Sequence, residues 1–147
     1  MRGWSLRELG PGGASFSTAS GGNTNNILGG DIKLEASAEV RSTILRNALT
    51  AEWIFAFFTD AGNVWFGSRN PGFRNLDADA PTGRFSFDSF YKELGVGSGV
   101  GLRVAWEYLI VRFDLAYRVY DPARPDAGAF PNGLRTPTPY FGIGHTF

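Results

Sequence analysis

Residues 93–120 read ELGVGSGVGLRVAWEYLIVRFDLAYRVY, and this stretch decides the fold class. Apolar residues alternate along it with small or polar residues, and the pattern breaks only at Glu107. Successive side chains of a β-strand point to opposite faces of a sheet, so this alternation predicts strands with one apolar face. We therefore expect strands at residues 93–106 and 108–120, joined by a tight turn with only Glu107 between them.

The first of these strands carries four glycines on one face, at positions 95, 97, 99 and 101. No helix pattern follows the glycines, so a dinucleotide-binding loop is the poorer explanation. Glycine in a strand is typical of a place where another chain segment comes close to the sheet. The opposite face is apolar, with Ser98 as its one polar member.

The same alternation predicts three further strands, at residues 31–42, 50–65 and 139–147. Residues 43–49 are a short connection, which predicts a hairpin. Residues 66–92 and 121–138 are rich in Gly, Pro, Asn and Asp and are expected to be long loops. The predicted fold is an all-β antiparallel meander of about five long strands, or six if residues 12–20 form another.

Composition excludes several classes of protein. The chain has 147 residues, enough for one domain, and 14 basic and 14 acidic residues, so it lacks the basic excess of a nucleic-acid-binding protein. It has no cysteine and one histidine, and we expect no metal site and no cofactor. With 20 glycines, 15% aromatic residues and only 19% charged residues, the composition indicates β structure in which many side chains face something other than water.

Strands of about ten residues, joined alternately by short turns and long loops, are typical of outer-membrane β-barrels. A water-soluble sandwich has the same alternation, because its apolar face forms the core. Strand length, loop asymmetry and the terminal phenylalanine favour the membrane. The apolar faces would then meet lipid, including Trp53, Phe55, Phe113, Tyr117, Phe141 and Phe147.

Two patterns suggest catalysis, and each has a simpler explanation. Glu39 and Asp60 are a candidate carboxylate pair of the kind that glycosidases use, but no neighbouring sequence indicates a sugar cleft. His145 alternates in phase with Phe141 and Ile143 on the apolar face, which argues against a catalytic triad.

Four segments, in this order along the chain, resemble motifs of the bacterial surface antigen family, which contains the BamA/TamA-type outer-membrane assembly factors. They are MRGW (1–4), FFTDAGNVW (57–65), FYKELGVGSGVGLRVAWEYLIVRFDLAYRVYDP (90–122) and FGIGHTF (141–147). The resemblance implies that residues 1–147 are the C-terminal part of a larger barrel. Residues 1–30 would be an extracellular loop with the family's Arg-Gly-aromatic motif, and residues 31–147 the last five strands. We expect the chain to be a piece of a longer protein.

The resemblance implies a non-enzymatic protein of the bacterial outer membrane. Its function would be to template the insertion of other β-barrel proteins. The alternative is a pore or protein-secretion translocator on the same scaffold, and an unrelated small barrel enzyme is a third hypothesis. The implied partners are membrane lipids, unfolded outer-membrane barrel proteins, and the N-terminal barrel part and periplasmic domains of the same protein. No nucleic acid is expected.

The alternation places Glu39 and Asp60 on the same face of neighbouring strands. The resemblance implies that the loop arginine binds such acidic groups inside the barrel, so we expect Arg2 to pair with both carboxylates, assisted by Gly3 and Trp4. An exposed loop arginine is the alternative. Tyr140, Gly142 and Phe147 fit the family's C-terminal strand signal, whereas His145 stands where the family prefers an aromatic residue.

Overall fold

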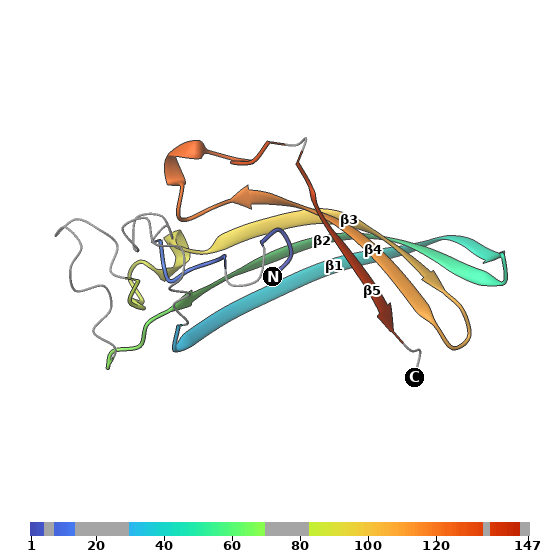
Figure 1. Cartoon of the computed structure of the whole chain (residues 1–147), viewed down its shortest axis with the longest axis horizontal. Helices are drawn as coiled ribbons and strands as arrows, with labels where there is room; N and C mark the ends of the chain where they lie inside the picture. The colour runs from blue at the N-terminus through green and yellow to red at the C-terminus, as the bar shows by residue number, and fades with distance from the viewer. Residues whose placement is uncertain (5–7, 14–29, 70–82, 134–135, 145–147) are drawn as a thin grey trace.

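The five predicted strands form one antiparallel sheet. The computed structural model describes residues 1–4, 8–13, 30–69, 83–133 and 136–144. The sheet order is β1-β2-β3-β4-β5, so each strand pairs with its neighbours in sequence, and the meander is confirmed (Figure 1). The strands are β1 (Ile32–Ala48), β2 (Ala51–Trp65), β3 (Gly95–Ala105), β4 (Ile110–Tyr120) and β5 (Thr138–Gly144).

The first hairpin is longer than the alternation predicted. Strand β1 continues through residues 43–48, and the turn consists of Leu49 and Thr50, whose φ angles of 58° and 57° reverse the chain direction. The pairing register shifts twice between Thr43 and Ala48. Such shifts break the regular alternation of faces, so the alternation predicts a connection where β1 in fact continues.

The second hairpin is wider than predicted. Strand β3 ends at Ala105 and β4 begins at Ile110, so four residues rather than Glu107 alone make the turn. The backbone N–H of Trp106 donates to the carbonyl of Leu109 at 2.7 Å and closes it.

The long connections contain two short 3-10 helices, η1 (Phe90–Lys92) and η2 (Pro125–Ala127). No helix among the described residues is long and apolar enough to cross a membrane. Of the candidate sixth strand at residues 12–20, Gly12 and Gly13 lie in a turn, and the rest lies outside the described residues.

The apolar face of the sheet is exposed and the polar face is buried, which is the opposite of what a water-soluble sandwich requires. On the apolar face, Phe113 is 44% exposed and Phe141 is 67% exposed. On the polar face, Asp60 and Asp114 are only 3% and 1% exposed. A sandwich would bury its apolar face, whereas a barrel wall in a membrane presents that face to lipid.

Of the other residues expected on the apolar face, Phe55 is exposed, Trp53 and Tyr117 are half-buried, and Phe147 lies outside the described residues.

The N-terminal segment covers the polar face and provides most of its burial. In Figure 1 this segment, in dark blue, lies across the middle strands, while the short turns lie at the far end of the sheet from the long connections. Among the described residues, the buried apolar side chains are Trp4, Ala51, Ala56, Phe58, Trp65, Phe66 and Ala116. Trp4 lies between the N-terminal segment and the sheet, whereas Trp65 packs edge-on against Phe85 of the 66–92 connection at 5.5 Å.

We predict that Phe113→Arg prevents folding of the complete barrel in membranes. A charge on the lipid-facing side near the bilayer midplane costs about 2–4 kcal/mol. The matched control is Ala105→Arg on the inner face, where Glu52 lies opposite in register and can pair with the new cation. Folding is measured on a gel, where the folded, unheated barrel migrates faster than the unfolded chain. Equal tolerance of both changes would contradict the assignment of Phe113 to the lipid-facing side.

We also predict that the chain expressed by itself oligomerises or aggregates. Strands β1 and β5 are the two edges of the sheet, and neither pairs with a further strand in the part of the chain that the structure describes. Unpaired edges bind other strands unless closure removes them. Size-exclusion chromatography with light scattering measures the outcome, and a monodisperse monomer in water would contradict it.

Candidate functional site

Arg2 is bound to the inner face of the sheet through Asp60. Its Nε and Nη2 atoms donate to the two carboxylate oxygens of Asp60, each at 2.8 Å, and its backbone N–H donates to Oδ2 at 3.1 Å. This two-pronged arrangement is the strongest geometry between a guanidinium and a carboxylate. The hydrogen bond to Asp60 raises the pKa of Arg2, so the guanidinium is permanently charged.

Four further side chains complete the surroundings of the guanidinium. Arg2 Nη1 lies 3.1 Å from Glu39 Oε2 and 3.4 Å from Asp114 Oδ2, and its Nη2 donates to the Ser37 hydroxyl at 3.2 Å. Its Cζ atom lies 3.5 Å from the ring centre of Phe58, which is fully buried. A flat cation on an aromatic face, ringed by carboxylates, satisfies both the charge and the donors of Arg2.

The backbone after Arg2 needs Gly3 and the glycines of β3. Gly3 has a φ of 96°, which side chains with a Cβ rarely adopt. A Cβ on Gly97 would lie 2.5 Å from the carbonyl oxygen of Arg2, and one on Gly95 would lie 3.0 Å from the Trp4 ring. Gly95 and Gly97 therefore make room for the docked loop, whereas Gly99 and Gly101 lie against Phe58 and Asp114 of the neighbouring strands.

Two side chains of the last strands hold the loop backbone. Arg118 of β4 donates from Nε to the carbonyl of Gly3 at 2.8 Å, and its guanidinium lies 5.2 Å from the Trp4 ring centre. The same arginine forms an ion pair with Glu8. The Tyr140 hydroxyl of β5 contacts the backbone of both Gly3 and Trp4 at 2.9 Å.

Two arginines of the sheet itself share the carboxylates with Arg2. Glu39 Oε1 accepts from Arg103 Nη2 at 2.7 Å and from Arg41 Nε at 2.6 Å, while its Oε2 faces Arg2. Asp114 Oδ1 lies 3.8 Å from Arg103 Nη2. Three arginines and three carboxylates thus balance in charge on the inner face, which reduces the free-energy cost of burying them.

The charged residues of the inner face bind the loop and leave a groove beside it. Among the described residues, no group of three or more His, Cys, Asp or Glu is placed to hold a metal ion. A charged groove of about 380 Å³ remains beside the docked loop, lined in part by Arg2, Glu39, Arg103 and Arg112.

The structure brings together all five residues proposed for the loop site. Arg2 contacts Glu39 and Asp60, and Gly3 and Trp4 lie against the inner face. Five further members were not predicted as site residues: Ser37, Phe58, Arg103, Asp114 and Arg118. The alternation had placed them on the inner face, but only the pairing register shows which of them reach the loop.

The proposed C-terminal strand signal is described in part. Gly142 lies against Arg112 of β4, because a Cβ there would come within 2.6 Å of the Arg112 Nε atom. The Tyr140 side chain contacts the loop, because its hydroxyl accepts a hydrogen bond from the backbone N–H of Gly3. His145 and Phe147 lie outside the described residues.

An open meander with an exposed apolar face, and a loop bound by ion pairs to its charged inner face, defines a class of protein: a β-barrel wall with an internal loop. The chain belongs to the Omp85 superfamily, since the model of the Omp85 superfamily domain matches residues 1–147. This superfamily is associated with the outer membrane and with protein insertion or secretion there, in agreement with the resemblance seen in the sequence. No curated protein and no solved structure matches the chain.

We predict that Arg2→Ala releases the loop from the inner face. Breaking one side of a buried ion pair costs about 3–5 kcal/mol, and we expect the low end because the Arg2 side chain keeps 19% exposure. Protease cleavage of the loop in the full-length protein measures release. Arg2→Asp combined with Asp60→Arg should recover part of the protection.

Arg46→Ala is the control for this experiment, because Arg46 is 82% exposed and far from the loop site. It should leave cleavage unchanged. If Arg2→Ala cleaves no faster than this control, the ion pair does not hold the loop.

Proposed function

We propose that this chain is the C-terminal barrel segment of an outer-membrane protein assembly factor. It acts in the bacterial outer membrane without catalysing a chemical reaction. Its substrates are unfolded β-barrel proteins, and it works together with the N-terminal barrel part and periplasmic domains of the same protein. The observation that carries the proposal is the state of β5, the last strand.

Strand β5 is the weakest-paired part of the sheet. It pairs with residues Ile110–Ala116 of β4, and its second edge carries backbone groups that no described strand pairs. A free edge of this kind can accept a strand from another chain by hydrogen bonding of the two backbones. Phe141 and Ile143 lie exposed on its apolar face, so an added strand would continue the lipid-facing surface.

The carboxylates considered for catalysis are engaged in holding the loop. Glu39 and Asp60 both accept hydrogen bonds from Arg2, and Asp60 also accepts from Ser37 at 2.6 Å. A general acid needs a proton to give, and ionised carboxylates bound to arginine do not supply one. This supports a binding role for the inner face.

A secretion translocator is the second candidate function. The charged groove on the inner face favours it, because arginines and carboxylates offer a polar path through a membrane. The docked loop occupies part of that path, and translocation would require it to leave.

Single-cysteine cross-linking distinguishes the two functions. This segment has no cysteine of its own, and any cysteine in the rest of the full-length protein is first replaced by serine. In the full-length protein in liposomes, Ile143→Cys is placed on β5 and Val100→Cys on β3. An unfolded barrel substrate that carries one cysteine in its terminal strand is then added. We expect disulfide cross-links at position 143 and none at 100, because both edges of β3 are paired.

The same liposomes are measured for acceleration of substrate folding and for ion conductance. Faster folding with cross-links at position 143 supports the assembly factor. Conductance that rises when Arg2→Ala frees the loop, without cross-links or faster folding, would overturn it in favour of the translocator.

A further inference from the structure

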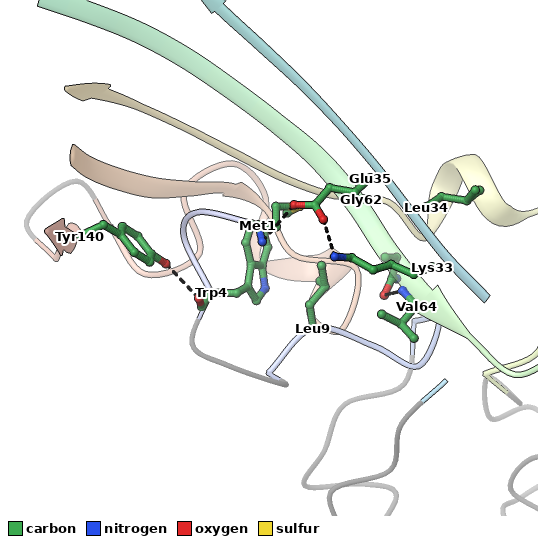
Figure 2. Close-up of a pocket in the computed structure, with 10 residues that line it drawn as sticks. Met1, Trp4, Leu9, Lys33, Leu34, Glu35, Gly62, Val64 and Tyr140 are labelled. Carbon is green, nitrogen blue, oxygen red and sulfur yellow. Dashed lines mark hydrogen bonds and ion pairs between the residues drawn. The ribbon is translucent and has the colours of Figure 1, made fainter. Parts of the chain in front are cut away.

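The hydroxyl of Tyr140 ties the internal loop to the last strand. It accepts a hydrogen bond from the backbone N–H of Gly3 at 2.9 Å and donates one to the carbonyl of Trp4, also at 2.9 Å. Figure 2 shows the ring of Tyr140 reaching toward Trp4 beside a pocket of about 470 Å³ under the loop. The phenol therefore uses both its donor and an acceptor position on the loop backbone.

The other contacts that anchor the loop motif lie on the four preceding strands. Arg2 binds β1 through Glu39, β2 through Asp60 and β4 through Asp114. The Trp4 ring packs over the glycines of β3, and Arg118 of β4 holds the carbonyl of Gly3. Among the described residues, Tyr140 makes the hydrogen bonds that join this motif to β5.

The two ends of this link differ in strength. The loop is held by ion pairs and a buried tryptophan, whereas the described part of β5 is short and pairs with Ile110–Ala116 of β4. An edge strand with few backbone partners opens at low free energy. Two hydrogen bonds to a firmly anchored loop are therefore a large addition to what holds β5 in place.

We propose that Tyr140 couples the docking of the loop to the pairing of β5, so that each state favours the other. When the loop is docked, Tyr140 holds β5 against β4. When the loop leaves, β5 loses these bonds and opens more often. Coupling of this kind is reciprocal, so opening of β5 also weakens loop docking. Its meaning for substrate insertion rests on the proposed function, but the coupling itself is a property of the fold.

Hydrogen exchange of the full-length protein in liposomes, without substrate, tests the coupling. The variant Tyr140→Phe removes the hydroxyl and keeps the ring. We expect exchange of the β5 amides at residues 138–144 to rise roughly 3- to 10-fold, as for the loss of one or two hydrogen bonds. Exchange in the β2–β3 pairing should stay unchanged.

Tyr120→Phe is the matched control. Tyr120 also donates a phenol hydrogen bond to a backbone carbonyl, that of Lys92 at 3.1 Å, and this bond joins β4 to η1 instead of joining β5 to the motif at residues 1–4. It should leave exchange in β5 unchanged. An equal rise in both variants would overturn the proposal, because the effect would then follow from any lost phenol bond.

A double-mutant cycle separates coupling from local loosening. Arg2→Lys keeps the charge but loses the two-pronged bond to Asp60, so it weakens docking. We expect it to raise β5 exchange in the native background and to add little in Tyr140→Phe, because the link is already cut. Additive effects of the two changes would overturn the proposal. Because no substrate is present, this failure would leave the proposed function standing.

Discussion

The ion pair between Arg2 and Asp60 is the interaction on which the rest of this structure depends. In a single sheet with an apolar outer face, the inner face becomes buried where another segment, here the N-terminal loop, packs on it. The loop brings a cation and Trp4, and the sheet offers Asp60, Phe58 and a row of glycines that leaves space for both. Removing Arg2 would leave the buried Asp60 carboxylate without its arginine, so the docked loop and the wall stabilise one another.

The charge balance around this pair extends into the sheet. Glu39 and Asp114 each turn one oxygen toward Arg2 and the other toward Arg103. The loop therefore enters a site whose carboxylates are already oriented by an arginine of the wall. Buried ionic networks add little net stability compared with apolar packing, but they accept few alternative arrangements. We interpret the network as a means of specifying where the loop docks.

The loop also connects parts of the sheet that differ in stability. Strands β1 to β4 pair along most of their lengths, while β5, within the described residues, pairs with the short segment Ile110–Ala116. Tyr140 joins this edge to the firmly held motif. An edge strand that exchanges partners needs a pairing of intermediate stability. A link to an internal loop is one physical way to adjust that stability.

The sequence by itself determined the strands, their faces and the space for the loop, because alternation is a local property with a period of two residues. It placed Glu39, Asp60 and the β3 glycines on one face, and the resemblance to a family supplied Arg2 as their partner. It failed where local order is broken, at residues 43–48, where register shifts disrupt the alternation. The tertiary structure alone decided which inner-face residues meet. Asp114, Arg103 and Tyr140 reach the loop through the pairing register and the path of the chain, and these depend on contacts between residues up to 137 positions apart.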